Sequence, residues 1–169
     1  NKKRDLLIVV GGGSLPPQLY DRPHEDELQP NRDRMEEQVI HYCVAHGIPI
    51  IATCRGMQYI NVMFGGKLWY HPKLPVNRTR GVDHQVWLVK EQRNIWVNNY
   101  HSDCIYEEGL ASCFEPLAID RENHVVEAYG SDEMKILALQ WHPERRFETA
   151  NAYEETRKII LDFIQKYVK

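Results

Sequence analysis

The sequence lacks several features that would place the protein in a specialised class. Its apolar runs fall well short of the roughly 20 residues that a membrane-spanning helix needs. Charges of both signs are scattered along the chain, with a net charge of −3, which argues against a nucleic-acid partner. The four cysteines lack C-x-x-C spacing and are too few for a disulfide framework, which favours a reducing, cytoplasmic compartment. We therefore expect one globular domain, for which 169 residues with 43% hydrophobic composition are sufficient.

Three consecutive glycines, residues 11–13, follow an apolar run over residues 5–10. Such a continuous run predicts a strand buried on both faces of a parallel sheet, and the glycine loop lets the backbone approach a ligand closely. A flexible turn after a core strand is the plainer interpretation. The pattern G-x-G-x-x-G is not completed, so the loop does not predict a dinucleotide site.

Residues 48–65 contain the most informative stretch of the chain. An apolar, β-prone run stops at Cys54, and Met57, Ile60 and Phe64 then recur at helical spacing. The cysteine therefore falls where a strand hands over to a helix. Because a helix N-terminus offers unpaired N–H groups and the positive end of its dipole, we expect the Cys54 thiol to ionise easily.

The other segments predict helices and short strands around this unit. A helical pattern begins near residue 31 and stops at Gly47, and a second one covers residues 151–168. Between them, short β runs separated by turn residues indicate antiparallel pairs with one solvated face. The β runs cover residues 85–89, 95–98, 114–120, 125–129 and 136–140.

A buried strand over residues 137–141 delivers His142 at its end, with Glu144 two residues further on. The proline between them restricts the backbone, so the two side chains are held in a defined relation. In an open α/β sheet, residues at the carboxyl ends of strands face one crevice. The glycine loop, Cys54 and His142 can therefore meet there.

These motifs resemble the class I glutamine amidotransferase-like superfamily, in its γ-glutamyl hydrolase branch, which includes γ-glutamyl-GABA hydrolases. The matching segments are residues 54–58, residues 141–144, the glycine loop and residues 97–101. The resemblance implies a flavodoxin-like open sheet, mostly parallel, flanked by helices and carrying the antiparallel β extension. Residues 1–169 would form a single such domain. Since the family has a strand and a helix before the first strand of this chain, we expect the native protein to supply them upstream.

The resemblance also implies a catalytic role for five residues. Cys54 would be the nucleophile, His142 the base and Glu144 the acid that orients it. The backbone N–H groups of Gly12 and Arg55 would stabilise the oxyanion.

The same comparison of motifs suggests how the substrate is held. Gln58, His101 and Asn99 are the candidates for binding the glutamyl group, and Asn99 stands where the family has serine. No cofactor and no metal are implied. The partner would be a small-molecule γ-glutamyl substrate, without nucleic acid or membrane, and a homodimer stays open.

The leading hypothesis is a cysteine-dependent hydrolase that cleaves a γ-glutamyl amide through a thioester and releases glutamate and an amine. The amine could be GABA-like, a polyamine or a nucleotide-linked phosphoramidate, and Arg78 and Arg80 keep the last option open. One alternative is a glutaminase subunit that supplies ammonia to a synthetase partner. Another is a non-catalytic regulatory domain that has kept the fold.

Overall fold

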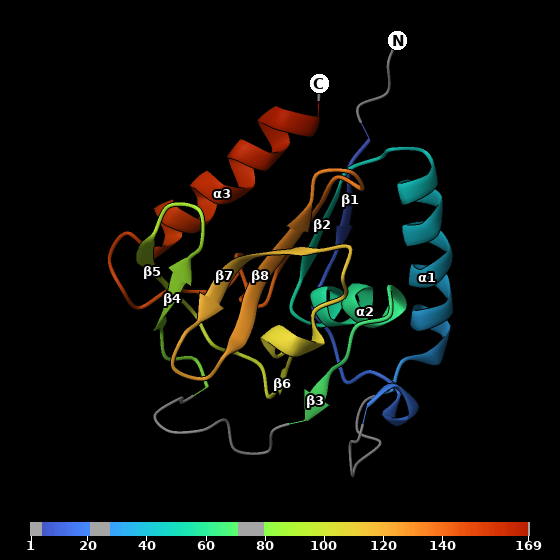
Figure 1. Cartoon of the computed structure of the whole chain (residues 1–169), viewed down its shortest axis with the longest axis horizontal. Coiled ribbons are helices and arrows are strands. Elements are labelled where there is room, and N and C mark those ends of the chain that lie inside the picture. The colour runs from blue at the N-terminus through green and yellow to red at the C-terminus, as the bar shows by residue number, and fades with distance from the viewer. Residues whose placement is uncertain (1–4, 21–27, 71–79, 169) are drawn as a thin grey trace.

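A computed structural model of the chain describes residues 5–20, 28–70 and 80–168. Its main sheet has seven strands in the order β1-β2-β9-β8-β7-β4-β5, and β3 pairs with β6 in a separate ribbon (Figure 1). The strands are β1 Leu7–Val9, β2 Ile50–Thr53, β3 Trp69–Tyr70, β4 His84–Leu88, β5 Arg93–Val97, β6 Asp103–Cys104, β7 Glu115–Asp120, β8 Val125–Ser131 and β9 Ile136–Leu139. The α-helices are α1 Pro30–Ala45, α2 Arg55–Met63 and α3 Ala152–Tyr167, with short 3-10 turns at Pro17–Leu19 and Glu107–Gly109.

The sheet is open and mixed, and its parallel part positions the site. Strands β1, β2 and β9 are parallel neighbours, with Val9 opposite Ala52 and Thr53 opposite Leu139. Strands β8, β7, β4 and β5 continue the sheet in antiparallel order. This confirms the flavodoxin-like fold with an antiparallel extension. Because parallel strands end at the same edge, the segments after β1, β2 and β9 lie together.

Helices cover both faces of the sheet (Figure 1). Helices α1 and α2 contribute Ile40 and Met57 to a core on one face, where they pack with Ile50 and Tyr129 of the strands. Helix α3 lies on the opposite face, where its residues Ile159 and Phe163 pack against a second core of strand side chains. The layers follow from strand side chains that alternate between the two faces.

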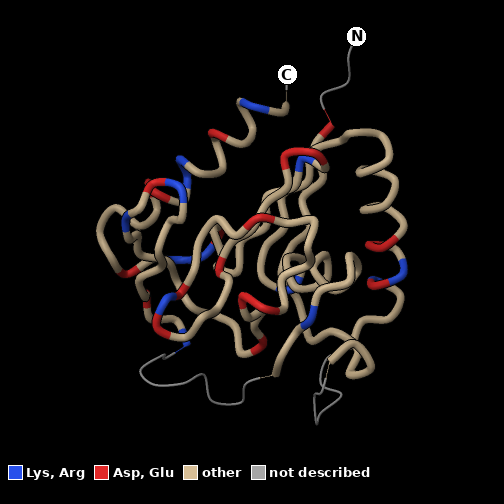
Figure 2. Tube along the Cα trace, in the orientation of Figure 1, with Lys and Arg blue, Asp and Glu red and all other residues tan. Residues whose placement is uncertain are grey.

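Charged residues of both signs are interspersed along the trace (Figure 2). In the ranges that the structure describes, no helix is long and apolar enough to cross a membrane. All four cysteines are free thiols, and Cys113 is the exposed one.

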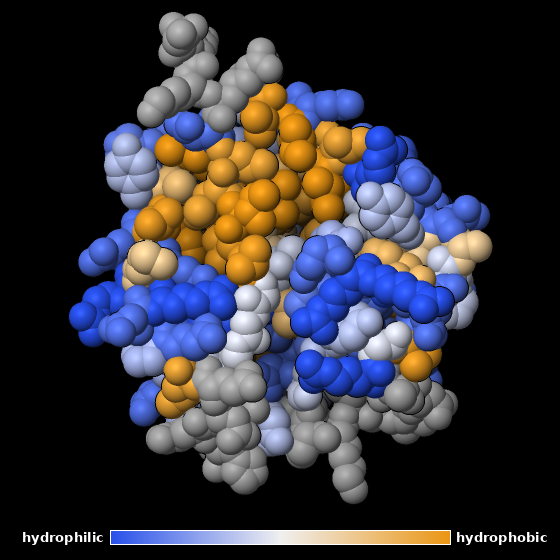
Figure 3. Space-filling view, turned by 180° about the vertical axis from the view of Figure 1, so that it is seen from behind, coloured by the Kyte–Doolittle hydropathy of each residue, from blue (hydrophilic) through white to orange (hydrophobic). Residues whose placement is uncertain are grey.

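Strand β1 departs from its predicted burial. Ile8 and Val10 are 57% and 56% exposed, so a strand buried on both faces is wrong. Ile8 and Val10 are exposed because β1 is an edge strand. Helix α3, which covers this face, packs over β5 at the opposite edge of the sheet. Figure 3 shows a broad apolar area on this side of the molecule.

Candidate active site

Cys54 occupies the sharp turn between β2 and α2. Its backbone has φ 50° and ψ −109°, a conformation that a non-glycine residue adopts only under strain, and such strain clusters at functional sites. Its N–H donates to the carbonyl oxygen of Leu139 at 2.7 Å, which ties the end of β2 to the end of β9. The turn presents the side chain at the edge of the sheet where the parallel strands end.

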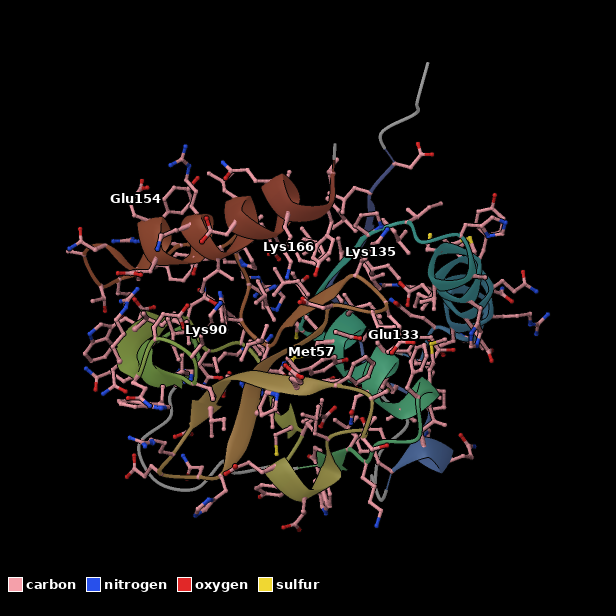
Figure 4. The ribbon with its side chains drawn as sticks, turned by 45° about the horizontal axis from the view of Figure 1, so that its top comes forward. Met57, Lys90, Glu133, Lys135, Glu154 and Lys166 are labelled. Carbon is pink, nitrogen blue, oxygen red and sulfur yellow. The ribbon has the colours of Figure 1, made fainter. Side chains whose placement is uncertain are left out.

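Helix α2 is pressed against the sheet immediately after this turn. A Cβ at Gly56 would lie 2.6 Å from the carbonyl oxygen of Val9, so only glycine allows the helix to approach β1 this closely. Met57 lies at the centre of the molecule between α2 and the sheet (Figure 4). The Tyr129 hydroxyl donates to its carbonyl oxygen at 2.6 Å. These contacts fix the direction in which α2 leaves Cys54.

His142 is held by a side chain on either side. Its Nδ1 lies 2.6 Å from Oε1 of Glu144. The Asn98 side chain donates to the His142 carbonyl at 2.8 Å and accepts from the His142 N–H at 2.9 Å. The sequence assigns no role to Asn98, although it lies in the segment 97–101 that resembles the family.

The glycine loop completes the arrangement. A Cβ at Gly11 would lie 2.7 Å from Cε1 of His142 and 3.6 Å from Cβ of Cys54, so Gly11 is packed against both residues. The structure therefore brings the ends of β1, β2 and β9 together, as the motifs predict. Gly11, rather than Gly12, makes the closest approach to His142.

A pocket of about 250 Å3 opens beside Cys54. Gly12 and residues 13–14 line one side, and Arg55 and Gln58 of α2 line another. Residues 100–103 and Arg80 complete the wall. Arg78 lies outside the described residues.

The three residues predicted to bind substrate differ in their placement. Gln58 and His101 line the pocket, but both contact the Asp103 carbonyl oxygen, with Gln58 Nε2 at 3.0 Å and His101 Nδ1 at 2.9 Å. Nε2 of His101 lies 3.6 Å from Oε1 of the buried Glu127. Asn99 is buried and is not among the residues that line the pocket.

The Cys54 thiol is not easily ionised, which corrects the expectation from its helix start. Burial raises the pKa of Cys54 to about 11, and this outweighs the N–H of Arg55 and the charge of Arg145, which both lower it. Burial also lowers the pKa of His142 below its ordinary 6.5, although the hydrogen bond with Glu144 opposes this. At neutral pH the site therefore holds a neutral thiol beside a neutral imidazole.

Glu144 and Arg145 complete the electrostatics of the site. Burial would raise the pKa of Glu144, but its hydrogen bond with His142 and a backbone N–H hold that pKa below the ordinary value. The Arg145 guanidinium stacks on the Tyr100 ring at 4.4 Å, and this ring makes a T-shaped contact with the His142 ring, with 5.7 Å between the centroids. The carboxylate can therefore orient the imidazole while the guanidinium discourages its protonation.

Relatives of known name share this chain's sequence. It is 30% identical over 164 residues to the glutamine amidotransferase-like protein YvdE of Lactococcus lactis, an alignment that covers 86% of this chain and 68% of YvdE. It is 28% identical over 169 residues to the gamma-glutamyl-gamma-aminobutyrate hydrolase PuuD of Escherichia coli, covering 84% of this chain and 65% of PuuD. The chain thus spans about two thirds of the length of these relatives.

A solved structure and a family model also match this chain. A glutamine amidotransferase from Thermotoga maritima has a TM-score of 0.59 at 21% identity, covering 94% of this chain and 64% of that one. This likeness shows the fold. Residues 2–144 match the family described as Peptidase C26. Because that match spans most of the sequence, the chain belongs to the Peptidase C26 family, within the class I glutamine amidotransferase-like superfamily.

Proposed function

We propose that the protein is a cysteine hydrolase that cleaves γ-glutamyl amide bonds through a γ-glutamyl thioester. One observation carries the proposal: Cys54 on its strained turn shares one end of the sheet with the hydrogen-bonded pair His142 and Glu144. The relative named as a gamma-glutamyl-gamma-aminobutyrate hydrolase supports the same reaction class.

The first step is proton transfer coupled to attack. Glu144 accepts the hydrogen bond from Nδ1–H of His142, which leaves Nε2 free to take a proton. As Sγ of Cys54 attacks the γ-carbonyl carbon, its proton passes to Nε2. Because the thiol and the imidazole both start neutral, thiolate forms during the attack and not before it.

The tetrahedral intermediate places a negative charge on the former carbonyl oxygen. The N–H groups of Gly12 and Arg55 would stabilise it, and losing one such donor generally costs roughly 10²–10³ in rate. The C–N bond then breaks, and the His142 imidazolium gives its proton to the departing amine. Water, deprotonated by His142, attacks the thioester, so that glutamate leaves and the Cys54 thiol is restored.

The pocket also bears on which amine leaves. Arg80 contributes a guanidinium to the wall of the pocket, and Arg145 lies beside the site on Tyr100. The guanidinium groups can pair with an amine that carries a carboxylate or phosphate, and the Asp103 carboxylate in the same wall can pair with a cationic amine, so the pocket offers a partner to either class. We place the reaction in a reducing cytoplasm, which keeps Cys54 a free thiol.

The full-length protein, incubated with a panel of γ-glutamyl compounds, tests this function. Mass spectrometry should detect glutamate and the free amine with wild type and neither with Cys54→Ser. Turnover of glutamine only when a synthetase is added would instead favour a glutaminase subunit. Failure of every compound, together with no labelling of Cys54 by a thiol-reactive glutamine analogue, would favour a regulatory domain.

A further inference from the structure

A charged cluster on the first turns of α1 lies directly behind the glycine loop. The Arg32 guanidinium donates through Nη2 to the carbonyl oxygen of Val10 at 2.6 Å, and through Nη1 to that of Gly11 at 3.0 Å. Nη1 also donates to Oε1 of Gln29 at 3.0 Å. A Cβ at Gly12 would collide with this guanidinium. Arg32 therefore fixes the path of the loop between β1 and the pocket.

The same cluster anchors the residue after the nucleophile. The Arg55 side chain is 1% exposed and points away from solvent into α1, where Nη1 donates to Oε2 of Glu36 at 2.7 Å and Nη2 pairs with Asp33. The other oxygen of Glu36 accepts from Nε of Arg32 at 2.6 Å. One carboxylate thus joins the two guanidinium groups.

The charges in this cluster balance. Two guanidinium groups face two carboxylates, and Figure 2 shows both signs close together on α1. Burial, with the neighbouring charge of Arg32, lowers the pKa of Arg55 to about 10, which still leaves it charged at neutral pH. A buried pair of this kind is costly to break by removing one partner. The cluster is therefore suited to holding the backbone of the glycine loop and of Arg55 in one position.

Peptide geometry converts these anchors into an arrangement of donors. In a trans peptide the C=O and the following N–H point in opposite directions. Because the Gly11 carbonyl is held toward Arg32, the N–H of Gly12 is directed away from Arg32, and Gly12 lines the pocket together with Cys54. The Arg55 N–H already lies within hydrogen-bonding reach of the Cys54 sulfur.

We infer that Arg32 and Glu36 are positioning residues that align both donors of the oxyanion hole, Arg32 through the glycine loop and Glu36 through Arg55. The inference rests on the proposed acyl-transfer chemistry and deepens it. Neither side chain is among the residues that line the pocket. Loss of Arg32 should slow the formation of a tetrahedral oxyanion while leaving the nucleophilicity of Cys54 unchanged. Loss of Glu36 also displaces the Arg55 N–H, which lowers the pKa of Cys54, so it should affect both properties.

Two reactions of the same thiol separate these effects. Acylation by p-nitrophenyl acetate passes through an oxyanion: Sγ of Cys54 attacks the ester carbon, its proton goes to His142, and p-nitrophenolate leaves. Alkylation by iodoacetamide displaces iodide at a saturated carbon and forms no oxyanion. In both reactions the proton of the Cys54 thiol passes to His142 as the sulfur attacks. Cys54→Ser supplies the background from the other thiols, chiefly the exposed Cys113.

Arg32→Met should lower the rate of Cys54 acylation by about 10²-fold, as a displacement near 1 Å in a reacting group does. The alkylation rate should stay at the wild-type value. Arg34→Met, an exposed change on the same helix, should alter neither rate. Arg32→Lys should restore part of the acylation rate because it keeps a cationic donor. Glu36→Gln should lower the acylation rate by more than the alkylation rate, because the Arg55 N–H serves both the oxyanion and the Cys54 sulfur. Thermal unfolding is measured for every variant.

Equal losses of acylation and alkylation in Arg32→Met would overturn the inference, and so would no loss in either. A wild type that alkylates but does not acylate would also contradict it, since no working oxyanion hole would exist. If wild type hydrolyses no γ-glutamyl compound but its acylation depends on Arg32, the proposed function fails and the positioning role stands. If wild type hydrolyses γ-glutamyl compounds and Arg32→Met leaves the ratio of the acylation rate to the alkylation rate unchanged, the positioning role fails and the proposed function stands.

Discussion

Asn98 holds His142 by both of its backbone groups. Its side-chain amide donates to the His142 carbonyl at 2.8 Å and accepts from the His142 N–H at 2.9 Å, and the Asn98 side chain is fully buried. The imidazole is thus fixed through its backbone by Asn98 and through its ring by Glu144. The base of the proposed mechanism is positioned from two directions.

Asn98→Ala should impair both stability and activity. It leaves two buried backbone groups of His142 unpaired, at a cost of roughly 1–3 kcal/mol for each. Chemical denaturation should show the lower free energy of unfolding. Turnover of a γ-glutamyl substrate should fall by about 10²-fold as His142 shifts. Asn94→Ala, at an exposed position in β5, should leave both measurements unchanged.

The pH dependence of kcat/KM should report the His142 imidazole. Since its neutral form is the base and burial lowers its pKa, activity should persist below pH 6.5 and be lost only as the ring protonates at lower pH. Glu144→Gln removes a partner that raises this pKa, so the acid limb should move further down while the plateau falls. An acid limb above pH 6.5 in the wild type would contradict the electrostatic account.

Two glycine substitutions should act differently. In Gly11→Ala the new Cβ meets the His142 ring, which can rotate away, so activity should fall by about 10²-fold with little change in stability. In Gly56→Ala the new Cβ meets the backbone of Val9. Because this backbone is part of β1 and cannot move aside, the free energy of unfolding should fall by about 1–3 kcal/mol. Equal effects of the two variants on stability would show that Gly11 is a packing residue and not part of the site.

Glu127 should be a large contributor to stability. Its side chain is fully buried, with Nε2 of His84 at 3.4 Å and Nε2 of His101 at 3.6 Å from Oε1. Losing a buried polar partner costs roughly 1–3 kcal/mol, so Glu127→Ala should lower the unfolding free energy by about that amount. Glu122→Ala, at an exposed turn position, is the matched control.

The same cluster predicts how stability depends on pH. The attraction of His101 and His84 outweighs burial and holds the pKa of Glu127 below its ordinary value. A carboxyl group with a lowered folded pKa contributes stability above its unfolded value, near 4.3, and loses that contribution as the pH falls. The difference between wild type and Glu127→Ala should therefore narrow below pH 4. A gap that widens on acidification would contradict the lowered pKa of Glu127.

The placement of Cys54 and His142 at one edge of the sheet is predictable from the sequence, because it depends on local patterns. Each follows an apolar run that forms a strand, and parallel neighbours end at one edge. The exposure of Ile8 was not predictable in this way, because it depends on β1 being an edge strand. The high pKa of Cys54 was missed for a related reason. It results from burial by segments far away in the chain, whereas the helix start is a local feature.

The residues that position the site, Asn98 and Arg32, are harder to predict from the sequence. Asn98 acts on a residue 44 positions away, and Arg32 acts on carbonyl groups of a loop 21 and 22 positions earlier. Neither forms a motif with its partner. Hydrogen bonds from a side chain to a distant backbone group leave no periodicity to read, so such residues emerge only when the strands are placed in order.

The γ-glutamyl thioester on Cys54 is the central claim, and its direct test is acid quenching during turnover followed by mass spectrometry of the cysteine-containing peptides. The account predicts a γ-glutamyl adduct on the Cys54 peptide of the wild type, its accumulation before glutamate is released, and its absence from a folded Cys54→Ser variant. Turnover without an adduct on Cys54, or turnover retained in Cys54→Ser, would contradict the account.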